Sequence, residues 1–211
     1  MQLGIGCRIL LGMSLRDRKR VRTRQAIVEA ATELFEKRGY DETTVAEIAA
    51  AAEIGTRTFF SYFTSKEEVM FAESDARVVA AIKAIADRAP DEPPASVLLR
   101  ALRTVGEDSD DMGSRMAALR VRFLRTVPAV RGRAAQIQFD AQREIARHLA
   151  AAYPGELTEV QAGALTGAFV GAVTGALAVL LDDLSEQDDP AAVQAAVREA
   201  TDIALAVYLK P

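Results

Sequence analysis

The sequence is poor in the side chains that most often carry catalysis and metal binding. It has one cysteine (Cys7), one histidine (His148) and no tryptophan. A lone cysteine forms neither an intramolecular disulfide nor a Cys-x-x-Cys metal motif, and a lone histidine cannot supply a histidine cluster. His148 lies in the helical stretch QREIARHLAAAY, without a serine and aspartate arranged for nucleophilic catalysis. We therefore expect no enzyme, no cofactor and no metal site.

Strand-type alternation of apolar and polar residues is also scarce. Half of the 211 residues are apolar, which is enough for a sizeable core. Proline and glycine separate segments whose apolar residues have helical spacing. We expect an all-α fold, with helices at 23–38, 45–52 and 56–63, a longer helix from 66 towards Arg88, and further helices at 95–106, 111–126, 129–153, 158–184 and 190–209.

The chain lacks an overall positive charge: 26 Lys and Arg stand against 30 Asp and Glu, a net charge of −4. This balance argues against a protein that coats nucleic acid non-specifically. The charge is uneven, however, because six basic residues and one Asp fall between Arg16 and Arg24. We expect residues 1–22 to form a flexible basic arm that contacts a DNA backbone or minor groove, with a solvated tail as the alternative.

The N-terminus does not have the order of a signal peptide. In MQLGIGCRILLG a short apolar stretch is broken by Arg8 and precedes the basic residues, whereas a signal peptide begins with its positive charge. Two interpretations account for this stretch: a disordered N-terminal tail, or a translation start at Met13 in place of Met1. We expect a cytoplasmic protein.

Aromatic residues are few, yet four of them gather in GTRTFFSYFTSKEEV, residues 55 to 69. The preceding segment opens with Thr44-Val-Ala-Glu47, which matches a helix capping box. Helix, tight turn and short helix are the plan of a helix-turn-helix, whose second helix enters the DNA major groove. Phe59 and Phe63 share one helix face and can anchor this short helix.

The other side chains of this segment suit DNA. Arg57 is the best base-reading candidate, because a guanidinium matches the O6 and N7 atoms of guanine. Phe60 can lie against a sugar or a thymine methyl, and the hydroxyl of Tyr62 can bind a phosphate. We expect further phosphate contacts from Thr44, Thr56, Thr58 and Lys66.

The motifs occur in the order found in a known family. The segment RQAIVEAATELFEKRGYDETTVAEIAAAAEIGTRTFFSYFTSKEEVMFA resembles the DNA-binding domain of the tetracycline-repressor (TetR) family of bacterial transcriptional regulators. The resemblance rests on A-x-x-LF-x-x-x-GY, TTV-x-x-IA, TFF-x-YF and SKE, in that order. It implies that the family's DNA contacts fall on Thr44, Thr56, Arg57, Thr58, Phe60, Ser61, Tyr62 and Lys66.

The turn between the two helices departs from the family pattern, which usually reads A-G-V-S. Here it is Ala52-Glu53-Ile54-Gly55. Glu53 stands where the family has glycine, so we expect a strained backbone there. Gly55 replaces a serine, which removes a helix cap and one hydroxyl contact.

The remainder of the chain carries no motif that points to chemistry. The resemblance implies a DNA-binding domain at 23–66 and an effector-binding and dimerisation domain at 67–211. We expect an apolar small-molecule effector, with Arg120, Arg122, Arg125, Arg131 and Arg133 either meeting an acidic head group or forming a solvated face. The candidate pocket residues are Ile82, Leu102, Met112, Met116, Leu119, Phe123, Phe139 and Phe169.

Glycines recur every four residues in the segment 158–184, on one helix face that another backbone can approach closely. Three interpretations remain open: a helix buried within one subunit, a membrane span and a homodimer interface formed with the last helix. We favour the dimer, because the segment is rich in Ala, Gly and Thr and has no flanking basic or aromatic anchors. The candidate interface residues are Gly163, Gly167, Gly171, Gly175, Ala204 and Tyr208.

Together these features predict a dimeric, ligand-responsive regulator, a repressor, that binds a palindromic operator in double-stranded DNA and is released by its effector. The alternative is a helical adaptor that uses the helix-turn-helix for protein contacts.

Overall fold

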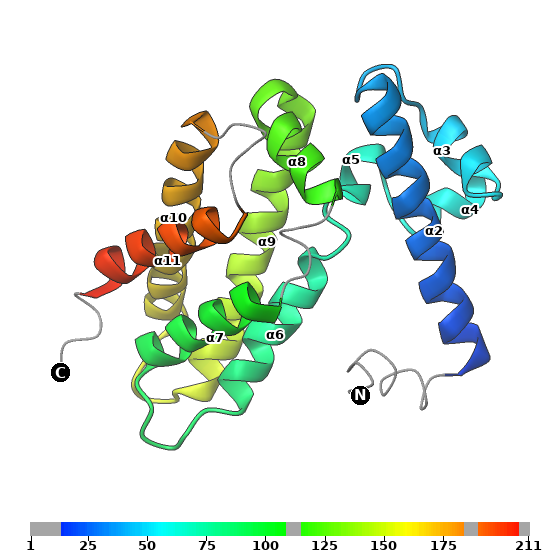
Figure 1. The fold of residues 1–211 in the computed structure, drawn as a ribbon. Helices are drawn as coiled ribbons and strands as arrows, with labels where there is room; N and C mark the ends of the chain where they lie inside the picture. Colours follow the sequence, from blue (N-terminus) through cyan, green and yellow to red (C-terminus); the bar gives the residue numbers. More distant parts are fainter. Residues whose placement is uncertain (1–13, 109–114, 184–189, 207–211) are drawn as a thin grey trace, which may run out of the picture. The chain divides into compact units, whose positions relative to one another are not determined.

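Every regular element that the computed structural model describes, in residues 14–108, 115–183 and 190–206, is helical (Figure 1). The expectation of an all-α fold is confirmed. The chain divides into two compact units, residues 1–72 and 73–211. The helices are α2 (Leu15–Arg38), α3 (Val45–Ala51), α4 (Thr56–Phe60), α5 (Lys66–Val69), α6 (Ser74–Ala86), α7 (Pro94–Asp108), α8 (Arg115–Thr126), α9 (Pro128–Ala152), α10 (Glu159–Asp183) and α11 (Pro190–Leu205).

In the first unit, α3 and α5 pack against α2, and α4 packs against α3. The core of this unit is built from side chains that are at most 1% exposed: Ile27, Ala31, Phe35, Ile48, Ala49, Phe59, Phe63, Val69 and Met70. Burying rings and branched side chains of this kind stabilises a fold by about 1.5–3 kcal/mol each. This packing holds α3 and α4, which are too short to be stable in isolation.

Helix α2 begins earlier than expected. Residues 15–22, which the sequence assigned to a flexible arm, form its first turns. Ser14 caps this end, since its hydroxyl accepts a hydrogen bond from the backbone N–H of Asp17 at 3.2 Å. Arginine and lysine are good helix formers, so a basic run that is capped continues the helix.

The expected helix from residue 66 towards Arg88 is interrupted. Turns at residues 70–73 separate α5 from α6, and the boundary between the two units falls here, after Ala72. We expected the first domain to end at residue 66. The difference arises because α5 packs on α2 through the buried Val69 and Met70 and so belongs to the first unit.

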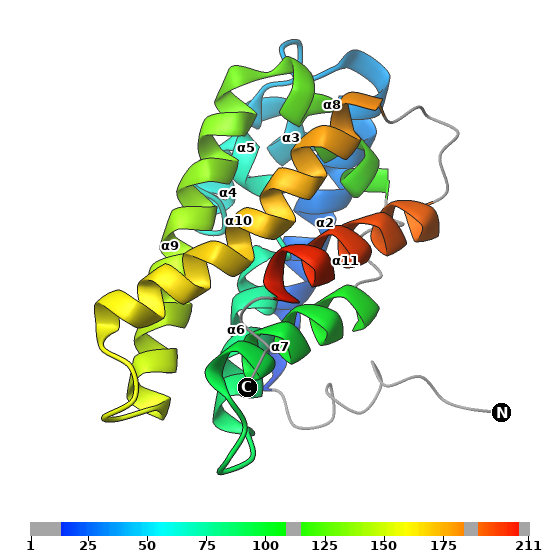
Figure 2. The same ribbon diagram turned by 90° about the vertical axis from the view of Figure 1, so that its left-hand side faces the viewer.

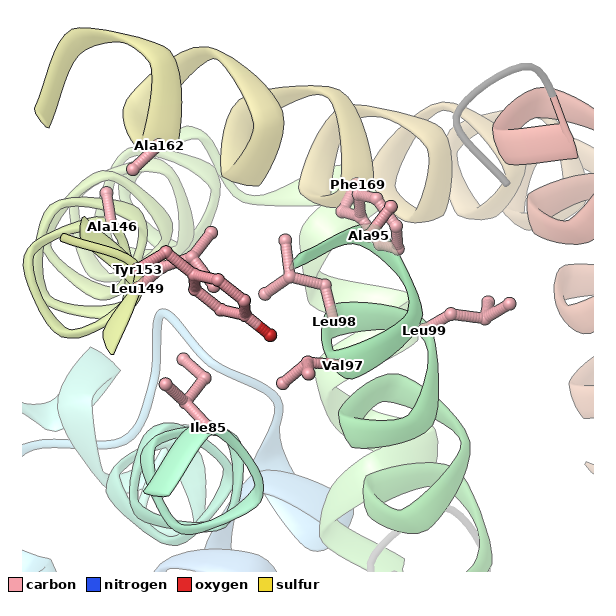
Figure 3. Close-up of a cluster of buried hydrophobic side chains, with 10 residues drawn as sticks. All are labelled: Ile85, Ala95, Val97, Leu98, Leu99, Ala146, Leu149, Tyr153, Ala162 and Phe169. Carbon is pink, nitrogen blue, oxygen red and sulfur yellow. The ribbon is translucent and has the colours of Figure 1, made fainter. Parts of the chain in front are cut away.

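The second unit is a bundle in which α6 packs on α7 and α9, and α10 packs on α9 and α11 (Figure 2). Four helices contribute to its main core, which is shown in Figure 3: Ile85, Ala95, Val97, Leu98, Leu99, Ala146, Leu149, Tyr153, Ala162 and Phe169. The hydroxyl of Tyr153 donates to the carbonyl of Glu92 at 2.6 Å. Arg100 grips the carboxylate of Glu92 with two hydrogen bonds, each of 2.9 Å.

Candidate nucleic-acid interface

The helix-turn-helix begins with the predicted capping box. The hydroxyl of Thr44 accepts a hydrogen bond from the N–H of Glu47 at 3.2 Å, and the Glu47 carboxylate accepts one from the N–H of Thr44 at 2.9 Å. The hydrogen bonds from Thr44 and the nearby Arg38 guanidinium hold the pKa of Glu47 below its usual range. Arg38 also binds this carboxylate at 2.6 Å, which joins the end of α2 to α3. Thr44 is exposed at the N-terminus of α3.

The turn after α3 bends at Glu53, whose φ of 55° lies in the left-handed region. The N–H of Glu53 donates to the carbonyl of Ala50 at 3.1 Å, and that of Ile54 to the carbonyl of Ala49 at 2.9 Å. These two bonds form a Schellman motif, which calls for a left-handed residue at this position, usually glycine. The expectation of a strained backbone at Glu53 is therefore confirmed.

Helix α4 presents two contrasting faces. Phe59 is 0% exposed and Phe63 1%, and their ring centroids lie 5.9 Å apart, so this pair anchors the helix as expected. Phe60, the next residue along, is 55% exposed. Thr56, Arg57 and Thr58 are also exposed. Helix α4 therefore combines an apolar anchor with an outward face that carries a guanidinium, two hydroxyls and a ring.

The residues at the end of α4 are partly engaged. The Ser61 hydroxyl donates to the carbonyl of Thr58 at 2.6 Å, and Ser61 is exposed. Tyr62 is half-buried, and the Arg20 guanidinium lies 5.8 Å from the centroid of its ring. Tyr62 is thus held on one side by α2.

Lys66 has a structural role that its sequence position did not indicate. Its ammonium donates to the carbonyls of Tyr40 at 2.8 Å and Thr43 at 3.0 Å, and lies 3.9 Å from the centroid of the Tyr40 ring. The Tyr40 hydroxyl donates to the Glu67 carboxylate. Burial raises the pKa of Tyr40, and this hydrogen bond adds to the increase. The cluster joins α5 to the loop between α2 and α3, and leaves one of the three ammonium donors for other partners.

Arg24 is a further residue of this site, and the sequence marked it only as the last member of the basic cluster that begins at Arg16. Its guanidinium donates to the carbonyls of Ala72 at 2.9 Å and Tyr62 at 3.5 Å. It also lies 4.4 Å from the centroid of the Phe63 ring. Arg24 thus connects α2 to the end of α4 and to the last residue of the first unit. Both acceptors are backbone carbonyls, so no side-chain pattern could have revealed them.

The candidate effector residues of the second unit differ in how deeply they are buried. Met116, Leu119 and Phe123 are buried on α8, and Phe169 is buried on α10. Ile82 and Leu102 are half-buried. Phe139 is 59% exposed, so in the single chain it does not line a buried site. Met112 lies outside the described residues.

The glycine stripe of α10 is open. Gly171 and Gly175 are exposed, and Gly163 and Gly167 are half-buried. In the part of the chain that the structure describes, a Cβ added at any of these four positions meets no atom within 4 Å. Ala204 on α11 is exposed, and Tyr208 lies beyond the described residues. The close approach that the stripe permits is therefore not used within the described parts of one chain.

Comparison with known proteins identifies the first unit. Residues 27–72 match the family described as "Bacterial regulatory proteins, tetR family". The chain is 43% identical over 94 residues to the HTH-type transcriptional regulator TcmR of Streptomyces glaucescens, which covers 44% of this chain and 42% of that protein. It is 40% identical over 48 residues to the HTH-type transcriptional regulator HbdR of Aromatoleum sp. (strain CIB). This match covers 23% of this chain and 21% of that protein. The matches thus span less than half the length of these relatives.

Two solved structures share the fold of most of the chain. A putative TetR-family regulator from Syntrophomonas wolfei is 17% identical with a TM-score of 0.57, covering 88% of this chain and 96% of that one. FadR of Thermus thermophilus, a TetR-family repressor solved with lauroyl-CoA, is 23% identical with a TM-score of 0.53, covering 89% and 96%. Residues 27–72 of this chain are thus similar to the tetR family of bacterial regulatory proteins, and the relatives matched in this region are HTH-type transcriptional regulators.

Proposed function

We propose that this protein is a transcriptional regulator whose α4 enters the DNA major groove. The observation that carries the proposal is the division of α4 between a buried anchor, Phe59, and exposed Arg57 and Phe60. An anchored helix can hold its outward side chains in register with base edges. Arg57 reads a guanine, and Phe60 packs on a sugar or a thymine methyl.

The surrounding polar groups bind phosphates and fix the register of α4 on the duplex. Thr56 and Thr58 offer exposed hydroxyls, and Thr44 offers a helix N-terminus. Ser61 and Tyr62 contribute hydroxyls at the other end of α4. Lys66 contributes the one N–H that its two carbonyl partners leave over.

The regulator acts as a homodimer on a palindromic operator, because one short helix reads too few base pairs for specificity and a two-fold dimer reads two half-sites. The open glycine stripe of α10, together with α11, supplies the contact between subunits. The apolar stretch Glu159–Leu180 is long enough to cross a membrane, and only 11% of its most apolar window is buried in the chain. A second copy covers this surface in a cytoplasmic protein.

An apolar small molecule that binds among the helices of the second unit releases the repressor from its operator. The fold supports this assignment, since FadR of Thermus thermophilus shares it and was solved with lauroyl-CoA, a ligand with an apolar chain. The effector favours one of two states of the dimer and changes the separation of the two α4 helices. A shift of a few ångströms prevents both helices from fitting their half-sites at once.

Selection of genomic fragments by the purified protein, followed by sequencing, tests this function. Enrichment of a palindrome, with an affinity that falls steeply with salt, is the expected result, because phosphate contacts release counterions. If no sequence is enriched even at low salt, the alternative of a helical adaptor is favoured. Gel filtration with light scattering reports the dimer, and Gly171→Leu is expected to weaken it. A protein that stays monomeric, or that requires detergent, contradicts the assignment of α10.

A further inference from the structure

The N-terminal half of α2 is an ordered, basic helix that extends past the core of the first unit. The first buried residue of α2 is Ile27, twelve positions after the helix begins at Leu15. Figure 1 shows the dark blue end of α2 continuing beyond α4. The first turns of α2 therefore contribute little to the core of the first unit.

The basic residues of this segment divide between two helix faces. Arg16, Arg20 and Arg24 are spaced four residues apart and share the face that, further along, carries the buried Ile27 and Ala31. That face lies along the end of α4, because Arg24 contacts the Phe63 ring at 4.4 Å and Arg20 contacts the Tyr62 ring at 5.8 Å. Arg22 lies about 200° around the helix from Arg20, on the opposite side.

Arg24 is bound to backbone carbonyls, but Arg16 and Arg20 are exposed, and neither enters an ion pair in the ranges that the structure describes. The nearest carboxylate in sequence, that of Asp17, accepts a hydrogen bond from the Ser14 hydroxyl at 2.6 Å. Residues 1–13 contain no Asp or Glu that could neutralise the two arginines. The face of α2 that carries Arg16 and Arg20, here called the arginine stripe, thus presents two cations to an external anion. They lie about 6 Å apart along the helix axis.

We propose that Arg16 and Arg20 bind backbone phosphates of the DNA next to the segment that α4 reads, so that the first turns of α2 are a rigid second part of the DNA interface. The inference rests on the proposed function of α4, because Arg20 is placed on DNA by its contact with Tyr62. Guanidinium groups suit phosphate oxygens, which they can bind with two parallel hydrogen bonds. Phosphate contacts carry no sequence information, so this part adds affinity and orientation and leaves base preference unchanged.

The test measures the salt dependence of affinity for the full-length protein on two duplexes: the fragment enriched from the genome and a mixed-sequence duplex of the same length. Arg16→Ala and Arg20→Ala are compared with Arg22→Ala, which removes the same charge from the opposite face of the same helix. Arg20→Lys keeps the charge. Far-UV circular dichroism confirms that α2 is retained, as expected since alanine is the best helix former.

We expect the slope of log affinity against log salt to fall by about one for Arg16→Ala and for Arg20→Ala on both duplexes, with Arg22→Ala and Arg20→Lys close to wild type. Affinity at moderate salt should fall about threefold to tenfold for each alanine variant. Equal slopes for Arg20→Ala, Arg22→Ala and wild type overturn the proposal, even if wild type still selects a palindrome. If wild type selects no sequence but the slope still falls for Arg20→Ala on mixed DNA, the arginine stripe is supported and the proposed regulator function fails.

Discussion

The guanidinium of Arg24, on α2, donates a hydrogen bond of 2.9 Å to the carbonyl of Ala72, forty-eight positions along the chain. Ala72 is the last residue of the first unit and lies in the turns between α5 and α6. The same guanidinium reaches the carbonyl of Tyr62 and the ring of Phe63. A single side chain thus joins the end of α4 to the point where the chain leaves the DNA-binding unit.

Arg24→Ala removes the hydrogen bonds to the carbonyls of Tyr62 and Ala72 and should destabilise the local structure around both residues. Hydrogen bonds from a charged donor contribute about 1.5–3 kcal/mol, so local opening of residues 58–72 should become markedly more frequent. Hydrogen exchange with mass spectrometry measures this, and peptides of α9 serve as the internal reference. Arg24→Lys keeps the charge, but its ammonium cannot reach both carbonyls as a guanidinium does. Its exchange rate in residues 58–72 should therefore lie between those of wild type and Arg24→Ala. Unchanged exchange in both variants contradicts the assigned role.

Glu53→Gly should stabilise the first unit. A non-glycine residue in the left-handed region costs about 1–2 kcal/mol, partly offset by the greater freedom of glycine in the unfolded chain, which leaves about 0.5–1 kcal/mol. Glu53→Ala is the matched control, because it removes the carboxylate and keeps the Cβ. Chemical unfolding followed by circular dichroism should show a gain for glycine that alanine lacks. If Glu53→Gly and Glu53→Ala gain the same stability, the effect comes from removing the carboxylate charge of Glu53 and not from the backbone conformation.

Two neighbouring phenylalanines should behave in opposite ways. Phe59→Ala removes a ring that is 0% exposed and should destabilise the first unit by about 3–5 kcal/mol. Phe60→Ala removes a ring that is 55% exposed and should change stability by about 0.5 kcal/mol or less while weakening DNA binding. Thermal unfolding and DNA titration on the same preparations separate the two effects. A Phe60→Ala variant with full DNA affinity removes this ring from the interface.

The second unit should lose stability in acid through Glu92. Hydrogen bonds from Arg100 hold the pKa of Glu92 below its ordinary value of 4.5. A carboxyl with a lowered pKa in the folded state stabilises the fold above about pH 4.5 and loses that contribution as the pH falls through the lowered pKa. Glu92→Gln should therefore cost about 0.5–1 kcal/mol near neutral pH, and its difference from wild type should close in acid. Unfolding measured across this range is the test, and a difference that stays constant with pH contradicts it.

Features that depend on neighbours in the sequence could be predicted. The Thr44–Glu47 capping box involves two residues that are only three positions apart. The strain at Glu53 followed from a single residue in a short turn. The start of α2 is also marked in the sequence. Ser14 and Asp17 are three positions apart, which is the spacing of a helix N-cap.

Features that depend on distant backbone could not be predicted. Lys66 contacts the carbonyl of Tyr40 across twenty-six positions, and Arg24 that of Tyr62 across thirty-eight. Every residue has a carbonyl, so nothing in the sequence marks these acceptors. The exposure of Phe139 depends likewise on how α9 packs in three dimensions, and its helical spacing alone did not reveal it.

The central claim is that α4 reads DNA through Arg57, and the most direct measurement is the affinity of wild type, Arg57→Ala and Tyr62→Ala for the enriched fragment and its single-base variants. We predict that wild type discriminates against substitution of one guanine in each half-site by about 1–3 kcal/mol and that Arg57→Ala loses this discrimination. Tyr62→Ala should weaken binding to all fragments equally, as the loss of a phosphate contact does. If Arg57→Ala keeps the full base preference of wild type, α4 is not the reading helix.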